Sequence, residues 1–245
     1  RWATHGGPTD RNAHPHVDND GKLAVIHNGI IENYAELKAK LESKGHKFSS
    51  DTDTESVAHL LSDLRKEHNG DLSAAMREAV KSLRGSFTLV AIHADTPDVI
   101  VGVRRNSPLV VGIGKNENFM ASDVAAFIDY TKRAIELGQD QVVTLTPTTV
   151  SITDLDGKTL TPKEYEITWD ASAAQKGGFS HFMLKEIFEQ PKAVADTLMA
   201  RLSDNKQILL DEIHLTPAEI KSLEKIVVIA CGTAYHAGMI AKYAI

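Results

Sequence analysis

Three polar clusters in the first 55 residues contain the residue types that carry catalysis and charge recognition. They are residues 1–6 together with 12–16, residues 27–29, and residues 51–55. In the second cluster, Asn28-Gly29 follows an apolar run and offers a side-chain amide and a backbone N–H, the donors that an oxyanion hole requires. Asn-Gly is also the favoured pair of a type I′ hairpin turn. The residues alone favour the turn and leave the oxyanion hole as the alternative.

Two charged residues of these clusters have the chemistry to bind a ligand group of opposite charge. Asp53 lies near an expected helix start, where a carboxylate binds an ammonium group or simply complements the helix dipole. Arg1 has the planar fork that grips a carboxylate through two hydrogen bonds, although a lone arginine is more often solvated. Both interpretations stay open for each residue.

Several weaker signals carry no function. The histidines His5, His14, His16 and His27 lack the ligand spacing of zinc modules, and we expect no metal site. The pair Gly112 and Gly114 lacks the third glycine and the following helix of a nucleotide-binding loop. Cys231, the single cysteine, follows an apolar run without a recognisable catalytic partner, so we do not expect it to be a nucleophile.

The apolar periodicity predicts an α+β layout around these clusters. An expected strand over 23–26 precedes helices that begin near Asn33, at Thr52 and at Asp71 or Ser73, and the spacing of Thr52 and Glu55 is that of a capping box. After Gly85 the period changes to that of strands. The expected strands, which would form an antiparallel sheet, are 86–93, 99–104, 109–113, 119–121, 140–145 and 148–153, with Asp156-Gly157 as a turn.

The C-terminal third has a different pattern. Residues 170–179 are small and turn-forming, which predicts a linker. Helices are expected over 182–189, closed by Pro191, over 193–202, and from Thr216. The apolar run 226–230 followed by helical spacing predicts the first strand, loop and helix of a parallel α/β domain.

Composition limits the partners and the compartment. The chain has 245 residues, 42% of them hydrophobic, and a formal net charge of −6, so it carries no basic surface for nucleic acid. No apolar run approaches the ~20 residues that cross a bilayer, so we expect no membrane partner. A single cysteine favours a reducing cytoplasm. Because the chain starts with Arg and stops within a helical pattern, we expect it to be a piece of a longer protein.

Together, the polar clusters resemble the isomerising glutamine:fructose-6-phosphate aminotransferase family, the glucosamine-6-phosphate synthases. The resemblance covers nearly the whole chain in collinear order. It rests on Arg1-Trp-Ala-Thr-His-Gly, Asn12-Ala-His-Pro-His, His27-Asn-Gly-Ile-Ile-Glu-Asn33, Ser50-Asp-Thr-Asp-Thr-Glu55 and Met183-Leu-Lys-Glu-Ile-Phe-Glu-Gln-Pro191.

The resemblance implies three regions. Residues 1–168 would be part of an Ntn-hydrolase type glutaminase, a class II glutamine amidotransferase domain. Residues 169–225 would be a linker with helices, and residues 226–245 the truncated start of a sugar isomerase (SIS) domain. The implied enzyme hydrolyses glutamine through a cysteinyl thioester, passes the ammonia internally and converts fructose 6-phosphate to glucosamine 6-phosphate. It needs no cofactor and acts as a homodimer.

The resemblance also assigns residues. Arg1 would bind the α-carboxylate of glutamine and Asp53 its α-ammonium, Thr4 and His5 would line the pocket, and Trp2 would form the gate towards the ammonia channel. Asn28 and Gly29 would form the oxyanion hole, and Thr233 would contact the sugar phosphate. Position 234 is Ala, where the family more often has Ser. The family's nucleophile, an N-terminal cysteine, is absent here, so we expect the chain alone to lack glutaminase activity.

Two other functions stay open. One is another class II amidotransferase with a different acceptor, against which the segment from Met183 to Pro191 and the SIS-like start argue. The other is a non-catalytic module that binds a sugar phosphate and regulates a partner. A cysteine at the mature N-terminus and a serine-rich loop after the next parallel strand would decide between these and the main interpretation.

Overall fold

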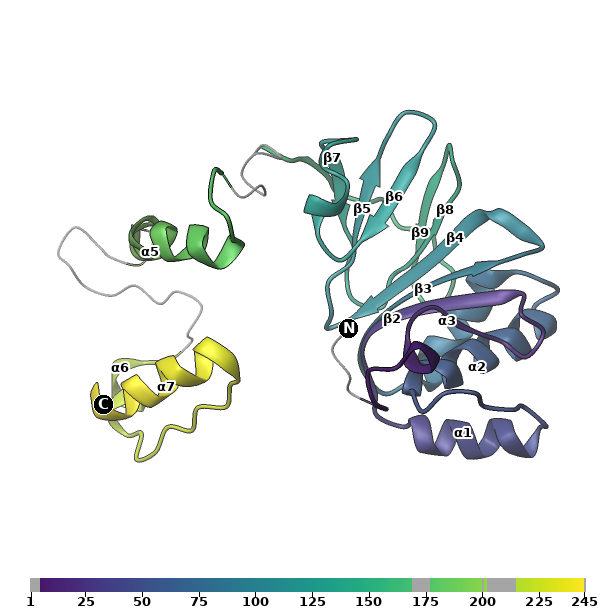
Figure 1. Cartoon of the computed structure of the whole chain (residues 1–245), viewed down its shortest axis with the longest axis horizontal. Coiled ribbons are helices and arrows are strands. Elements are labelled where there is room, and N and C mark those ends of the chain that lie inside the picture. The colour runs from purple at the N-terminus through teal and green to yellow at the C-terminus, as the bar shows by residue number, and fades with distance from the viewer. Residues whose placement is uncertain (1–4, 169–176, 200, 202–214, 245) are drawn as a thin grey trace. The chain divides into compact units, whose positions relative to one another are not determined.

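The computed structural model describes residues 5–168, 177–199, 201 and 215–244 of the chain. The chain divides into two compact units, Arg1–Gly177 and Gly178–Ile245. Figure 1 shows the sheets and helices of the first unit and the helices of the second.

The first unit contains two antiparallel sheets. The six-stranded sheet has the order β1-β2-β3-β4-β8-β9, and the four-stranded sheet has the order β10-β7-β5-β6. The strands of the first are β1 (His16–Val17), β2 (Leu23–Ile31), β3 (Gly85–His93), β4 (Thr96–Arg105), β8 (Val142–Leu145) and β9 (Val150–Thr153). Those of the second are β5 (Val110–Ile113), β6 (Asn118–Ala121), β7 (Arg133–Glu136) and β10 (Glu164–Glu166).

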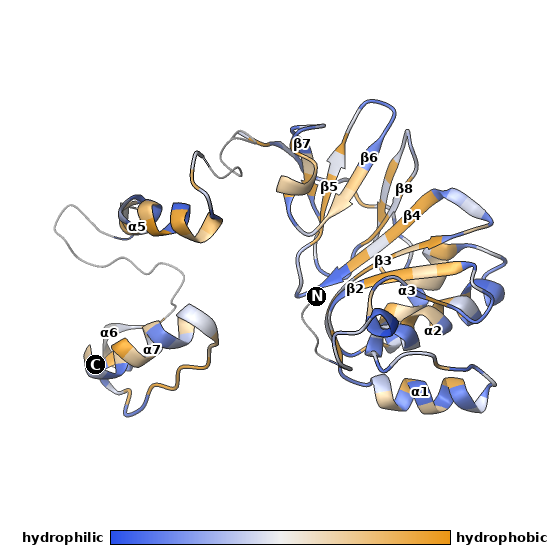
Figure 2. Cartoon of the chain, viewed as in Figure 1, coloured by the Kyte–Doolittle hydropathy of each residue, from blue (hydrophilic) through white to orange (hydrophobic). Residues whose placement is uncertain are grey.

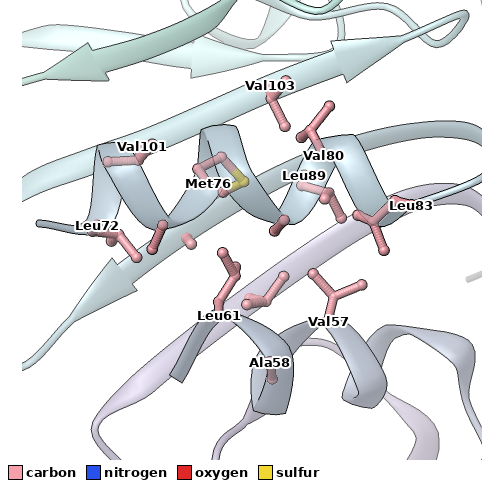
Figure 3. Close-up of a cluster of buried hydrophobic side chains, with 14 of the residues drawn as sticks. Val57, Ala58, Leu61, Leu72, Met76, Val80, Leu83, Leu89, Val101 and Val103 are labelled. Carbon is pink, nitrogen blue, oxygen red and sulfur yellow. The ribbon is translucent and has the colours of Figure 1, made fainter. Parts of the chain in front are cut away.

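Two helices, α2 (Asp53–Glu67) and α3 (Leu72–Ser82), cover one face of the six-stranded sheet, and α1 (Tyr34–Ser43) packs against α2 (Figure 1). The buried core below the sheet joins side chains of α2 and α3, such as Leu61 and Met76, to Leu89 and Val101 of the strands (Figure 3). Figure 2 shows hydrophobic residues along β2, β3 and β4 and a mostly hydrophilic α1. Burial of apolar area drives this packing. The packing therefore fixes the position of the helix ends relative to β2.

The other face of the six-stranded sheet packs against the four-stranded sheet. Val143, Leu145 and Ile152 meet Leu109 and Val111 in a second cluster of buried side chains. The short 3₁₀-helix η2 (Val124–Ala126) lies beyond the second sheet, which brings Phe127 and Ile128 into a third cluster. The α+β class is confirmed, with two sheets in place of the single one expected. Strand β7 had no counterpart in the sequence prediction.

The prediction of a hairpin turn at Asn28-Gly29 is wrong. Both residues lie inside β2, where Asn28 pairs with Thr88 and Gly29 with Phe87 of β3. The ladder with β3 continues to Ile31, so the strand runs past the turn-forming pair. Gly29 has φ +120°, and a Cβ at this position would lie 2.0 Å from the carbonyl oxygen of Ser86. The glycine is therefore needed for close strand approach rather than for a turn.

The helix starts were predicted with mixed success. Asn33 and Thr52 precede α1 and α2, and Asp71 caps α3 by accepting from the backbone N–H groups of Ser73 and Ala74. The capping box at Thr52 is wrong, because Thr52 makes no cap hydrogen bond. Its expected partner Glu55 instead binds the loop before the helix.

In the second unit, helix α5 (Phe182–Met199) continues through Pro191, so the predicted break there is wrong. The ion pairs Lys185–Glu189 and Lys192–Asp196, each four residues apart, support the helix on both sides of the proline. Most of the predicted linker lies in 169–176, outside the described residues.

Helix α6 (Pro217–Lys221) follows directly after Thr216, where a helix start was expected, and Thr216 forms a complete capping box with Glu219. The expected strand 226–230 is not a strand, because no described strand of this unit supplies a ladder. The following helix, α7 (Gly232–Ala244), is present. Within the described part of the chain, no helix is long and apolar enough to cross a membrane.

Candidate active site

Asp53 joins the end of a strand to the start of a helix. It is the first residue of α2 and is 1% exposed, and its Oδ2 accepts a hydrogen bond of 2.8 Å from the backbone N–H of Ile31 in β2. The N-terminus of α2 places the positive end of the helix dipole at this carboxylate. Asp53 therefore serves as a structural link whether or not it also binds a ligand.

Two histidines flank the Asp53 carboxylate. His5 Nδ1 lies 3.7 Å from Oδ1, and His27 Nδ1 lies 3.9 Å from Oδ2. His27 Nδ1 also lies 2.9 Å from the hydroxyl of Thr54, and the His5 ring packs edge-on against Tyr34 at 4.5 Å. His5 and Asp53, both assigned to the glutamine pocket from the sequence, are thus neighbours. Both imidazole rings therefore lie within 4 Å of the Asp53 carboxylate, which accepts a hydrogen bond from Ile31.

Glu55 holds the loop that leads into Asp53. Its two carboxylate oxygens accept hydrogen bonds from the backbone N–H and the hydroxyl of Ser49, at 2.7 and 2.9 Å, and from the same groups of Ser50, at 2.7 and 2.6 Å. Burial raises the pKa of the Glu55 carboxyl, but the neighbouring His59 ring and the hydrogen bonds from the two serines outweigh it and hold this pKa well below its usual value. His59 Nε2 lies 3.5 Å from Oε1.

This role of Glu55 is not predicted by the sequence pattern. The spacing to Thr52 indicates a capping box, and the signal for a different role is the polar run 49–55, which is too long for a cap alone. Every residue from Asp53 to His59 is buried, although five of these seven residues are polar or charged. Buried polar groups are normally hydrogen-bonded, so such a run indicates a network.

The polar cluster at residues 12–16 contacts the same loop. Asn12 Oδ1 accepts from the Asp51 N–H at 2.9 Å, and His16 Nε2 lies 3.1 Å from the hydroxyl of Thr52. Arg11 forms an ion pair with Asp51. The first and third clusters of the sequence therefore form one network around the start of α2. Among the described residues, no group of three potential ligands could hold a metal ion.

Asn28 and Gly29 lie on the same strand as His27 but present another surface. Side chains alternate between the faces of a strand, so Asn28 points away from the helix face that His27 occupies. Asn28 is exposed, and its Nδ2 donates to Ser122 Oγ at 3.0 Å, just after β6 of the second sheet. The expected oxyanion donors, Asn28 and Gly29, thus lie in β2, the strand whose Ile31 donates to Asp53. Asn28 and Asp53 are not in direct contact.

The remaining site predictions are not brought together. Arg1, Trp2 and Thr4 lie outside the described residues. Thr233 is the second residue of α7, in the second unit, and Cys231 is exposed just before that helix. Neither is placed relative to Asp53.

Comparisons with known proteins identify a glutamine amidotransferase domain in this chain. A family model described as a glutamine amidotransferase domain matches residues 5–129. The chain is 59% identical to a glutamine-fructose-6-phosphate aminotransferase (isomerizing) from Streptomyces coelicolor, 57% to one from Corynebacterium glutamicum and 52% to one from Mycobacterium tuberculosis. Each match covers 100% of this chain, and the chain spans about 40% of the length of these relatives.

Two solved structures share the fold at low sequence identity. One is the glutamine phosphoribosylpyrophosphate amidotransferase from B. subtilis complexed with ADP and GMP, with a TM-score of 0.52 and 22% identity over 63% of this chain and 33% of that one. The other, described as the allosteric regulatory enzyme of purine biosynthesis, gives 0.51 and 21% over 61% and 32%. The α+β arrangement of the first unit is thus that of the Ntn-type amidotransferases. On the family match to residues 5–129, the chain belongs to the glutamine amidotransferase domain family.

Proposed function

We propose that this sequence is the glutamine-binding part of an isomerising aminotransferase that makes glucosamine 6-phosphate from fructose 6-phosphate. The relatives that match it from end to end are named for glutamine and fructose 6-phosphate. Sequence identities of 52 to 59% to these relatives support this function over an amidotransferase with another acceptor. The sequence identity to such an enzyme, the phosphoribosylpyrophosphate amidotransferase, is 22%.

The observation that carries the proposal is the Asp53 carboxylate, fixed by the Ile31 N–H beside Asn28-Gly29. Glutamine is a zwitterion with a neutral side-chain amide, so its pocket needs an anion, a cation and a group that acts on the amide. Asp53 would bind the α-ammonium and Arg1 the α-carboxylate, while His5 and Thr4 line the pocket and Trp2 forms the gate for ammonia. A fixed anion binds the ammonium without paying for reorganisation.

The strand register supports the oxyanion hole. The Ile31 N–H points to Asp53 and not to β3, so the pair Ile31 and Gly85 lacks ladder hydrogen bonds. Pairs two residues apart in an antiparallel ladder are of the same kind. We infer that the Gly29 N–H also points to the edge of β2 away from β3. Among the described residues, β1 pairs only with Ala24 and Val25 on that edge, which leaves the edge at Gly29 open.

The proposed reaction starts with a thiolate that adds to the carboxamide carbon of glutamine. The negative charge that develops on the amide oxygen would be stabilised by Asn28 Nδ2 and the Gly29 N–H. Loss of ammonia then leaves a thioester, which water hydrolyses to glutamate. The nucleophile would be the N-terminal cysteine that the family resemblance implies, and not Cys231, the one cysteine of this sequence. That the chain alone is inactive stays a prediction.

The sugar side of the proposal rests on less of the chain. Thr233 at the start of α7 would contact the sugar phosphate, and residues 226–245 would open the isomerase domain. A homodimer, the absence of a cofactor and a cytoplasmic location stay predictions.

The test is Asn28→Asp in a full-length protein that contains this sequence. Asp keeps the size of the side chain but replaces the donor amide with an acceptor carboxylate. Glutamate release from glutamine should fall by ~10² to 10³, the scale for loss of one oxyanion donor. Glucosamine 6-phosphate formation from externally added ammonia should be unchanged, provided that the parent enzyme uses ammonia.

A matched control is Asn69→Asp, at an exposed position after α2 that lies away from the site. It should leave both reactions unchanged. Normal glutamate release from the Asn28→Asp variant would remove Asn28 from the oxyanion hole, and with it the proposed site.

A further inference from the structure

The amide of Asn28 links the two sheets of the first unit. Asn28 lies in β2 of the six-stranded sheet, and its Nδ2 donates at 3.0 Å to the hydroxyl of Ser122, which follows the last residue of β6 in the four-stranded sheet. The two residues are 94 positions apart. No motif in the sequence singled out Ser122.

An asparagine amide needs such an anchor if it is to act as a preorganised donor. The χ2 torsion of asparagine is broad, so a surface amide without a partner samples many orientations. The NH₂ group carries two hydrogens in one plane. When one hydrogen is held by a fixed acceptor, the direction of the other is fixed as well.

We propose that Ser122 is a positioning residue for the glutaminase reaction. Its Oγ holds one Nδ2 hydrogen of Asn28, so that the second hydrogen is directed at the oxyanion. The inference rests on the proposed function, because it assigns Ser122 a role only through Asn28.

Ser122 is itself held on both sides in the chain. Ala121, the preceding residue, pairs with Val110 of β5, and the Asp123 side chain, which follows, caps η2 by accepting from the Ala125 N–H at 2.8 Å. The backbone of Ser122 is therefore fixed by its neighbours on both sides.

The nearest hydroxyls on β3 are committed to other partners. Thr88, directly across the ladder from Asn28, donates its hydroxyl hydrogen to the Pro108 carbonyl at 3.0 Å. Ser86 donates to the Arg105 carbonyl at 3.4 Å. A hydroxyl that donates can also accept, but the acceptor that Asn28 Nδ2 contacts is Ser122 Oγ, so the geometry assigns the anchoring of Asn28 to the second sheet.

The test compares Ser122→Ala with Ser122→Thr in a full-length protein that contains this sequence. Loss of the hydroxyl should lower kcat for glutamate release by about tenfold, because the amide of Asn28 becomes free to rotate. The KM for glutamine should change less than about twofold, since Ser122 does not touch the proposed Asp53 pocket. Threonine keeps the hydroxyl and should restore most of kcat.

Asp123→Ala is the matched control. It removes the cap of η2 and loosens the same turn, but it leaves the Ser122 hydroxyl in place. If Ser122 positions Asn28, this variant loses thermal stability while kcat stays near that of the parent. An equal fall of kcat in Asp123→Ala and Ser122→Ala would show that the turn is merely structural and would overturn the assignment.

A double variant separates this inference from the proposed function. In the Asn28→Asp background, Ser122→Ala should cause no further fall of kcat, because the amide that it positions is gone. Additive losses would overturn the inference. Full activity of Ser122→Ala beside an inactive Asn28→Asp would overturn the role of Ser122 alone, whereas full activity of both would overturn the proposed site as well.

Discussion

The backbone N–H of Ile31 donates to the carboxylate of Asp53 at 2.8 Å, and this bond ties the last residue of β2 to the first residue of α2. In the proposed function the same carboxylate binds the ammonium group of glutamine. One oxygen, Oδ2, faces the strand, while Oδ1 faces His5 at 3.7 Å. The charge of Asp53 and its hydrogen-bonding geometry can therefore be separated, because an amide keeps the hydrogen-bond acceptor but removes the negative charge.

Asp53→Asn should weaken glutamine binding with little loss of stability. The amide oxygen can still accept from Ile31, but a neutral group cannot offset the substrate ammonium. A charge-assisted contact is worth ~1.5 to 3 kcal/mol, so the KM for glutamine should rise roughly 10- to 150-fold. Steady-state kinetics and thermal unfolding of the full-length variant check this.

Asp71→Asn provides the control for a helix-start carboxylate. Asp71 caps α3 in the same way that acidic residues commonly stabilise helix starts, and it lies outside the proposed site. Its replacement should leave the KM unchanged. An unchanged KM in Asp53→Asn as well would reduce Asp53 to its structural role at the start of α2.

The sequence predicted elements better than contacts. Local signals such as the helix cap at Asp71 or Ser73, the helix start at Thr216 and the change of period after Gly85 depend on neighbouring residues, and the structure confirms all three. Asn28-Gly29 was misassigned because its conformation is decided by β3, more than 50 residues away in the chain. No local pattern reports such a partner.

The candidate site follows the same division. The polar residues that form the site could be picked out by type, and the structure does bring His5 to Asp53. The roles of Glu55 and Ser122 could not, because each depends on the fold: Glu55 on a buried loop and Ser122 on the second sheet. Proline at position 191 shows the reverse error, where a strong local rule yields to a helix supported on both sides.

Gly29→Ala should destabilise the protein far more than an alanine at another glycine with positive φ. At Gly29 the new Cβ would lie 2.0 Å from the Ser86 carbonyl oxygen, so β2 and β3 would have to separate. Backbone strain and overpacking each cost ~1 to 3 kcal/mol, so the free energy of unfolding should fall by roughly 2 to 6 kcal/mol. Chemical denaturation measures this loss.

Gly45→Ala isolates the strain. Gly45 has φ +98°, and nothing beyond its own chain neighbours lies within 4 Å of the position that a Cβ would take. Only the backbone cost of about 1 to 2 kcal/mol therefore applies. Similar losses for the two variants would show that the approach of β2 to β3 at Gly29 is not tight.

Glu55→Gln should lower stability at neutral pH, by about 1.5 to 3 kcal/mol. The glutamine NH₂ group would face backbone and hydroxyl hydrogens of Ser49 and Ser50, which are themselves donors. The pKa of Glu55 is lowered in the folded protein from its ordinary value of 4.5. Below that ordinary value the unfolded state therefore binds more protons, and the free energy of unfolding rises with pH in this range.

The contribution of Glu55 is thus complete above about pH 4.5 and is lost as the pH falls towards its folded pKa. The difference in unfolding free energy between the parent and Glu55→Gln should be constant from about pH 5.5 to 8 and should shrink below pH 4.5. Taking the difference removes the contributions of Asp18 and Asp63, whose pKa values are also lowered.

The control is Glu36→Gln, which removes an exposed ion pair with Arg84 and should change stability by less than about 1 kcal/mol at neutral pH. A difference for Glu55→Gln that stays the same from pH 7 down to pH 3 would mean that the carboxylate charge does not hold the loop before Asp53.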